Sequence, residues 1–524
     1  MLRSDDHTRR QKTFDVLLTA EEAYPALERE FLDARTEIWA SFRVFDPTTR
    51  LRSEAAREFG ETWTDLIMAT LQRGVVVNLI ISDFDPIVRP ELHSCTWKAH
   101  RLLTEAADLC GVADRLRLNP AMHQARTGLF FRCLFWPAIL HRQFRAAGWL
   151  NRQSQPDRAS AIRDMPGLRK ALVRRADGRF RPRLWPLPKL CPATHHQKLA
   201  VFDRKRLYIG GLDLDERRYD SPDHTREAEQ TWHDVQLLLD GPAVREAQDH
   251  LESFLDVTSG IRSPAPGRRL VRTMSRPYRQ DFLHMGPEPV VSEIAVAHEH
   301  LARRTKRLIY VETQFFRDVK LAQLLARRAR DNPDLGMILI LPGAPEEVAF
   351  ERRVKLDARY GEYLQSRALK VLREGFGNRL FVGGAAQQRR HPGTSVNDTG
   401  RDRLNGAPIV YIHAKVSIFD DTAAIVSSAN LNGRSLRWDT EAGLFVRGAA
   451  DVGKLRHKVM SHWLPETPGE GFFDPLRAVP EWRRLAQKNA RRRPDQREGF
   501  LLPYDMKAAE EFATDVGIIP DEMV

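Results

Sequence analysis

Cysteine is scarce in this chain, and long apolar runs are missing. The 524 residues include only Cys95, Cys110, Cys133 and Cys191, and these four lack the paired spacing of metal-binding motifs. We therefore expect reduced thiols without a catalytic role. No run approaches the roughly 18 apolar residues that a membrane-spanning helix needs. The polar N-terminus (residues 1–7) has no apolar segment, so we expect no secretory signal.

An eight-residue pattern occurs twice, 217 residues apart. The first copy runs from His196 to Asp203 and the second from His413 to Asp420, with lysine at the third position of each copy. Residues 1 and 3 of a strand point to the same face, so each copy presents an imidazole beside an ammonium group. That pair suits attack on an anionic ester, because the lysine holds the charge while the histidine reacts. Two such copies are far less expected by chance than one.

The rest of the chain also reads as a duplication. A helical stretch (Ala20 to Ala34) precedes the apolar run Thr36 to Phe45, and a second (Val291 to Arg304) precedes Lys306 to Glu312. Short β-rich apolar runs alternating with helical patterns predict an α/β fold, with mixed sheets flanked by helices. We predict two pseudo-symmetric lobes, residues 1–258 and 288–470, joined by a Pro- and Gly-containing linker and followed by an extension, residues 471–524. The site would lie between the lobes.

These motifs and their surroundings resemble the phospholipase D superfamily, whose two HxKxxxxD motifs build one active site. Several stretches are similar to phospholipase D proper, in a bacterial-type form without C2, PX or PH modules: Gly210-Gly211-Leu212-Asp213-Leu214, Arg218-Tyr219-Asp220, Trp232-His233-Asp234-Val235, Gly241-Pro242-Ala243-Val244, Ile309 to Phe316 and Ser428-Ala429-Asn430-Leu431-Asn432. The resemblance extends over roughly residues 30 to 465 and implies the duplicated fold of that superfamily.

The resemblance also implies roles for the site residues. His196 would attack phosphorus and form a phosphohistidine, while His413 would act as general acid and base. The two motifs are nearly symmetric, so the residues alone leave that order open. Lys198, Lys415 and Asn430 would bind the phosphate oxygens, with Asp213 and Ser428 as further members of the phosphate site.

Carboxylates complete the expected site. Each histidine needs a partner on its other ring nitrogen. By the resemblance, Glu441 would orient His413, and we assign Asp234 to His196. Asp203 and Asp420 belong to the catalytic motifs, but at strand ends we expect them to support structure more than chemistry. We expect no cofactor and no metal, and we interpret His195 and His233, which look metal-like, as packing or supporting residues.

Residues 126 to 189 hold the chain's excess of positive charge. This segment has 15 basic and three acidic residues, an excess equal to the net charge of +12 for the whole chain. Aromatic residues are mixed with the arginines, as at a surface that binds anionic lipid headgroups. The alternative is an insertion that packs on the first lobe with a solvated arginine face.

Three enzyme classes stay open. A phospholipase D that hydrolyses or transfers phosphatidyl groups is favoured over a phosphatidyltransferase of the cardiolipin or phosphatidylserine synthase kind. A nuclease of the same superfamily ranks third, and we expect no nucleic-acid partner. We expect a monomer that acts on phospholipid in the cytoplasm or at a membrane surface. Export by a signal-independent secretion system is a further alternative.

Overall fold

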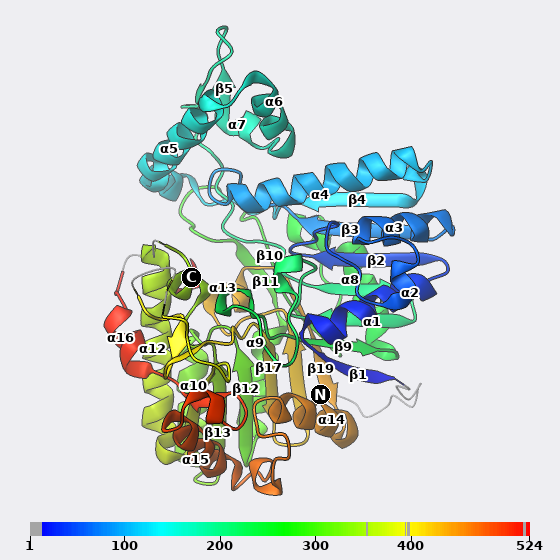
Figure 1. Cartoon of the computed structure of the whole chain (residues 1–524). Coiled ribbons are helices and arrows are strands. Elements are labelled where there is room, and N and C mark those ends of the chain that lie inside the picture. The colour runs from blue at the N-terminus through cyan, green and yellow to red at the C-terminus, as the bar shows by residue number, and fades with distance from the viewer. Residues whose placement is uncertain (1–12, 353–354, 394, 396–398, 517–519, 524) are drawn as a thin grey trace.

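Two mixed β-sheets form the framework of the molecule (Figure 1). The computed structural model describes residues 13–352, 355–393, 395, 399–516 and 520–523. The first sheet has, in spatial order, β1 (Phe14–Leu18), β9 (Val235–Leu239), β8 (Arg206–Gly210), β7 (Leu199–Phe202), β2 (Glu37–Phe42), β3 (Val76–Ser82) and β4 (Leu116–Ala121). The pairs β2–β3 and β3–β4 are parallel, and the remaining neighbours are antiparallel.

The second sheet repeats this order and adds a strand at each edge. It comprises β11 (Glu288–Ser292), β10 (Leu270–Arg276), β19 (Glu441–Arg447), β18 (Ala423–Ser427), β17 (Lys415–Phe419), β12 (Leu308–Thr313), β13 (Gly336–Leu341), β14 (Leu380–Ala385) and β20 (Leu501–Pro503). Strands β10, β19, β18, β17, β12, β13 and β14 thus match β1, β9, β8, β7, β2, β3 and β4 in order. The α/β class and the two pseudo-symmetric lobes predicted from the sequence are confirmed.

Helices cover both sheets. In the first lobe they are α1 (Thr19–Asp33), α2 (Glu54–Arg57), α3 (Trp63–Gln72), α4 (Pro90–Leu109) and α8 (Pro242–Ser259). In the second they are α9 (Glu293–Arg304), α10 (Val319–Asp331), α11 (Glu346–Ala349), α12 (Leu356–Phe376), α13 (Gly433–Arg437), α14 (Ala449–Ser461), α15 (Ala478–Ala490) and α16 (Met506–Phe512), with a small ladder of β15 (Arg403–Leu404) and β16 (Ala407–Pro408). The predicted helices before β2 and β12 are present as α1 and α9.

Local sequence explains where α8 begins and ends and which of its faces is buried. It begins at Pro242, where the missing N–H costs nothing, and ends before Gly260, whose φ of +82° suits a left-handed C-terminal residue. Its buried face follows the helical period through Val244, Ala247 and Leu251. These side chains belong to the hydrophobic cluster that both lobes share.

That shared cluster joins the two lobes. It contains Leu199, Val201 and Leu237 from the first sheet and Val416, Ile418 and Val426 from the second. Each such side chain contributes about 1.5–3 kcal/mol when it is removed from water. The lobes are therefore held together by a common core and not only by a linker.

The domain boundaries differ from the predicted ones. Strand β10 lies in the stretch expected to be a linker, and it pairs with β19 just as β1 pairs with β9. The proline and glycine residues around it hid this strand from the sequence reading. The expected C-terminal extension also belongs to the second lobe, because β20 pairs with β14 and Trp482 of α15 is buried in the shared core.

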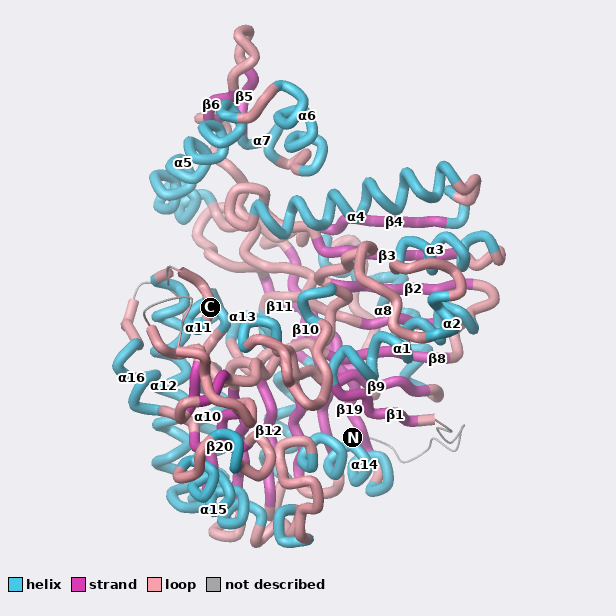
Figure 2. Tube along the Cα trace, in the orientation of Figure 1, coloured by secondary structure: helices cyan, strands magenta, loops and turns pink. Residues whose placement is uncertain are grey.

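Residues 126 to 189 project from the first lobe as an arm (Figures 1 and 2). The arm consists of α5 (Leu129–Arg152), α6 (Gln155–Asp164), α7 (Leu168–Ala171), β5 (Leu172–Arg174) and β6 (Phe180–Pro182). It has a small hydrophobic cluster of its own, which includes Ile139, Leu150 and Leu168. Within the described ranges, no helix is both long and apolar enough to cross a membrane.

Candidate active site

The two motif histidines lie where the lobes meet. The His196 amide donates to the Thr440 carbonyl (2.8 Å), and the His413 amide donates to the His233 carbonyl (2.7 Å). Each motif therefore runs beside the other lobe's chain, just before that chain supplies a carboxylate. A further anchor is the Thr194 amide, which donates to Asp439 Oδ1 at 2.7 Å. The structure thus brings together residues 180 to 245 positions apart in the sequence.

The carboxylate partners are exchanged relative to the predicted assignment. Glu441 Oε2 lies 3.1 Å from His196 Nδ1, and Asp234 Oδ2 lies 2.6 Å from His413 Nδ1. The prediction that Glu441 orients His413 and Asp234 orients His196 was wrong. The physical reason is the pairing between lobes, because each histidine lies alongside the residue that precedes the other lobe's carboxylate. In both rings Nδ1 faces a carboxylate, which leaves Nε2 for chemistry.

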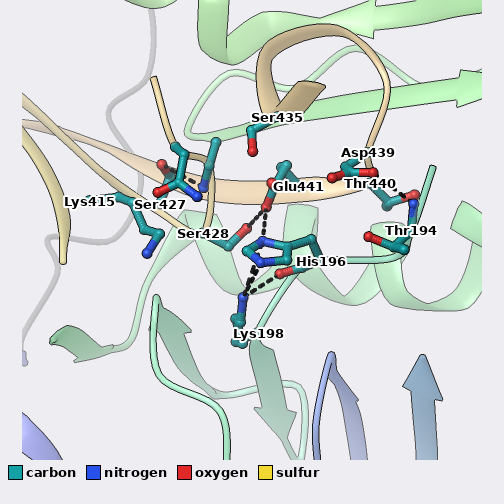
Figure 3. Close-up of polar contacts among 12 residues, drawn as sticks. Thr194, His196, Lys198, Lys415, Ser427, Ser428, Ser435, Asp439, Thr440 and Glu441 are labelled. Atoms are coloured by element: carbon teal, nitrogen blue, oxygen red, sulfur yellow. Dashed lines mark hydrogen bonds and ion pairs between the residues drawn. The ribbon is translucent and has the colours of Figure 1, made fainter. Parts of the chain in front are cut away.

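Both motif lysines are buried, and Figure 3 shows Lys198 against the His196 ring. Lys198 Nζ lies 3.2 Å from His196 Nδ1 and 3.4 Å from Nε2, and it donates to the His196 carbonyl at 2.7 Å. Lys415 Nζ donates to the His413 carbonyl. Strand β7 begins at Leu199 and β17 at Lys415, so the reactive residues lie at or just before the strand starts rather than within the strands.

Burial sets the charge state of this site. It lowers the pKa of His196 and of His413 well below the usual value, and the nearby lysines act in the same direction, so both rings are neutral. Burial also lowers the pKa of Lys198 to about 8 and of Lys415 to about 7. An anion that enters the site would raise all four pKa values, because it favours the charged form of each group.

The two carboxylates experience the opposite effect. Burial raises the pKa of Asp234 to about 6 and that of Glu441 to about 8, against the lowering influence of the lysine cations. Ser428 Oγ donates to Glu441 Oε2 at 2.5 Å. The sequence reading placed Ser428 at the phosphate, but its hydroxyl instead supports the carboxylate that faces His196.

Asp213 and Asn430 occupy equivalent places but differ in their contacts. Asp213 Oδ2 is 4.0 Å from both Lys198 Nζ and Arg218 Nη2, so its negative charge holds these cations. A carboxylate in that position would repel a phosphate, which corrects the expectation that Asp213 binds it. The Asn430 side-chain amide donates to Gln314 Oε1 at 3.1 Å, and its Oδ1 is buried without a hydrogen bond to another described residue.

Asp203 and Asp420 lie away from the reactive groups, although they complete the two motifs. Asp203 accepts from the amides of residues 35, 36 and 37 at 2.8–3.1 Å, and Asp420 accepts from those of residues 306, 307 and 308 at 2.9 Å. Both have a positive φ, +48° and +53°. These contacts tie the strand end to the chain that enters β2 or β12.

Sequence reasoning assigned no role to several residues that the structure places at the site. The Trp232 ring lies 4.6 Å from the His413 ring, centroid to centroid, and Arg218 stacks over Trp232 at 4.2 Å. The Arg434 side chain donates to Asp439 at 2.8 Å. Arg218 and Trp232 lie in stretches that resemble the family, but nothing in their spacing indicated these contacts. The ring of His195, the neighbour of His196, does not contact the reactive groups but lies with Nδ1 2.8 Å from the Thr440 hydroxyl.

The chain is similar to several known proteins. A family model described as "Cardiolipin synthase, PLD-like domain" matches residues 301–463. Phospholipase D alpha 1 of Nicotiana tabacum is 22% identical over 354 residues, which cover 46% of this chain and 44% of that protein. Phospholipase D alpha 4 of Arabidopsis thaliana is 23% identical over 414 residues, with coverage of 59% and 54%. The chain thus spans about half the length of these plant relatives.

A solved structure also aligns with this chain. Phosphatidylserine synthase from Haemophilus influenzae Rd KW20 gives a TM-score of 0.47 at 12% identity, covering 86% of this chain and 85% of that one.

Proposed function

Because this chain belongs to the phospholipase D superfamily, we propose that it cleaves the distal phosphodiester of glycerophospholipids to phosphatidic acid and a headgroup alcohol. One observation carries this proposal. Two histidines are each oriented through Nδ1 by a buried carboxylate, next to two buried lysines, within one interlobe site. Both motifs come from a single chain, so we propose that a monomer suffices.

The proposed reaction has two displacement steps. In the first, the entering phosphate anion raises the pKa of His413, so that this ring takes up a proton from solvent on Nε2. His196 Nε2 then attacks phosphorus, the bond from phosphorus to the headgroup oxygen breaks, and His413 gives its Nε2 proton to the leaving alcohol. In the second, His413 takes a proton from water, the water oxygen attacks phosphorus, and the phosphorus–nitrogen bond to His196 breaks. An alcohol in place of water would yield a transferred phosphatidyl group. This step makes a phosphatidyltransferase the second candidate, which the family model over the second lobe also favours.

The lysines explain how the site would handle charge. Lys198 lies against His196 Nε2 in the resting site, so an incoming phosphate would draw its ammonium group away from the ring and onto a phosphate oxygen. Removing one such donor costs about 10²- to 10³-fold in kcat. We expect Lys198→Met to lose that amount, while Lys205→Met, at an exposed position in the turn after β7, keeps wild-type activity.

Vesicles of phosphatidylcholine, phosphatidylethanolamine or phosphatidylglycerol, with ethanol present, test the reaction. We expect wild-type protein to form phosphatidic acid and phosphatidylethanol, and His196→Ala to form neither. Phosphatidylethanol without phosphatidic acid would favour the transferase. If no vesicle yields either product and single-stranded DNA is cut instead, the lipid proposal is wrong.

We further propose that the arm docks on anionic membranes. Large apolar side chains are exposed on it, and they include Phe130, Leu134, Phe144, Leu184 and Trp185, the last with 75% of its surface exposed. Such side chains would enter the headgroup region, and the arm's excess of 12 positive charges would bind anionic lipids.

Vesicle sedimentation tests the arm directly. We expect the double variant Phe144→Ser/Trp185→Ser to lose binding to vesicles that contain phosphatidylglycerol, and binding of the wild type to fall with added salt. The control Ile261→Ser removes an equally exposed apolar side chain after α8, outside the arm, and should bind normally. Equal binding by the arm variant and the control would refute membrane docking through this segment.

A further inference from the structure

Three histidines gather behind the active site. Nitrogen atoms of His224, His233 and His462 all lie within 4.8 Å of one another. His224 Nε2 is 2.9 Å from His462 Nε2, and the ring centroids are separated by 4.5 Å (233–462), 5.1 Å (224–462) and 5.8 Å (224–233). His224 and His233 belong to the first lobe, whereas His462 follows α14 in the second. Their separation in the chain concealed this group from the sequence reading, which found no ligand cluster.

Carboxylates orient two of these rings. Asp220 Oδ2 lies 2.6 Å from His224 Nδ1, so Nδ1 carries the proton and Nε2 presents a lone pair. Glu312 Oε2 lies 3.2 Å from His233 Nε2, which leaves the lone pair on Nδ1. That Nδ1 atom is buried and has no hydrogen-bond partner in the described part of the chain. A carboxylate on the far nitrogen is the arrangement that metal-binding histidines use.

The carboxylates are themselves buried among neutral groups. Besides its histidine, Asp220 Oδ2 accepts from the Trp232 amide at 2.7 Å, and Glu312 Oε1 accepts from Tyr310 (2.5 Å) and Trp463 (2.9 Å). Among the described residues, neither carboxylate is paired with a lysine or arginine. Buried charges of this kind are costly unless a counter-charge is near.

We propose that His224, His233 and His462 bind one divalent transition-metal ion, Zn²⁺ or another that prefers imidazole ligands. Zinc binds imidazole nitrogen at about 2.0–2.1 Å, so small ring movements from the present spacing would close the site. Water would complete a tetrahedral set, and the ion would offset the charge of Asp220 and Glu312. Three neutral imidazoles favour zinc, copper, iron or nickel over magnesium or calcium.

This ion would act as a structural tie and not in the chemical step. The His233 carbonyl accepts from the amides of His413 (2.7 Å) and Ala414 (3.1 Å), and the next residue, Asp234, orients His413. A metal held by His233 and His462 would therefore fix the catalytic segment and link the two lobes. The polar ring contacts of these histidines are to Asp220, Glu312 and one another and include no hydrogen bond to a described side chain of the two catalytic motifs, so we call these three histidines positioning residues.

Metal analysis of the full-length protein tests this proposal without any substrate, so its outcome is independent of the proposed lipid reaction. After incubation with Zn²⁺ and dialysis, we expect about one ion per chain and a higher Tm than after chelator treatment. His462→Gln removes the partly exposed ligand and should lower zinc affinity by at least about 100-fold, since the loss of a supporting group alone costs 10- to 100-fold. Its Tm should no longer respond to zinc.

The matched control is His457→Gln, at an exposed position on α14, the helix that His462 follows, where the ring stacks on Phe473. It should bind one ion and respond as the wild type does. If His462→Gln fails to fold, the visible spectrum of Co²⁺-loaded wild type replaces it, and we expect the d–d bands of tetrahedral nitrogen ligation. Wild-type protein that binds no zinc, a cobalt spectrum without those bands, or a folded His462→Gln with wild-type zinc affinity would each overturn the proposal.

Discussion

The crossed pairing between histidines and carboxylates makes a prediction that separates it from the uncrossed arrangement. Asp234→Asn should impair the same chemical step as loss of His413, and Glu441→Gln the same step as loss of His196. The two substitutions keep side-chain size and change only the charge and the hydrogen-bonding pattern. Each therefore perturbs one ring while the other keeps its partner.

The magnitude follows from the contacts. A charge-assisted hydrogen bond such as the 2.6 Å contact of Asp234 contributes about 1.5–3 kcal/mol, and about 1.4 kcal/mol corresponds to tenfold in rate. Loss of orientation alone should thus slow turnover about 10- to 150-fold. If the amide also selects the wrong tautomer of His413, the loss should approach the roughly 10⁴-fold known for the aspartate of serine proteases.

The assay compares two substrates with different leaving groups. A phosphatidyl ester of p-nitrophenol needs no proton on its leaving oxygen, so the step that forms the phosphohistidine should recover in variants that lack the general acid. We expect rapid-mixing bursts of p-nitrophenol at about the wild-type rate from His413→Ala and Asp234→Asn, no burst from His196→Ala, and a burst slowed at least about 10-fold from Glu441→Gln. Because each carboxylate variant is compared with both histidine variants, the grouping tests the pairing even if the two histidines exchange roles. If Asp234→Asn behaved like His196→Ala, the crossed pairing would be refuted.

Two further predictions concern pH and structure. Burial raises the pKa of Asp234 to about 6 and that of Glu441 to about 8, and both carboxylates must ionise to orient their histidines, whereas Lys415 and Lys198 lose their protons above about 7 and 8. The kcat/KM of the free enzyme should therefore have a narrow maximum at about pH 7–8 and fall on both sides, and a flat profile from about pH 6 to 9 would contradict these assignments. Asp420→Ala should lower the free energy of unfolding by about 2–4 kcal/mol in denaturant titrations, because three amides lose their acceptor and alanine disfavours the positive φ. Asp421→Ala, at an exposed neighbour, should cost less than about 0.5 kcal/mol, and an equal loss in both variants would argue against the structural role of Asp420.

Much of the fold could be predicted because both copies of the duplicated unit contain the same local patterns, short apolar runs that follow helical stretches. The runs that became β2, β3, β12 and β13 are continuous and apolar, as expected of strands buried on both faces. Strands that mix polar and apolar residues were harder to find. Strand β10 carries Arg272, Thr273 and Ser275 among its apolar residues, and its identity depends on pairing with β19.

The site was predictable in its residues but not in its pairings. Spacing identified the histidines and lysines, because the same eight-residue pattern of His, Lys and Asp occurs twice in the chain. It could not show that Ser428 contacts Glu441, or that Asp213 faces Lys198, because those contacts depend on how strands from separate stretches align. The cluster of His224, His233 and His462 is a stronger example, since it draws on three segments without a shared motif.

The crossed pairs also explain why neither lobe can be regarded as half of an enzyme. The first lobe contains His196 but lacks Glu441, and the second contains His413 but lacks Asp234. Each of the two catalytic imidazoles is therefore oriented across the interface, and any change that shifts the lobes would misalign both rings together. The shared hydrophobic core under the site resists such shifts. A duplicated fold of this kind gains its activity from the contact between the copies, so substitutions at the lobe interface should affect catalysis more than equally buried substitutions within one lobe.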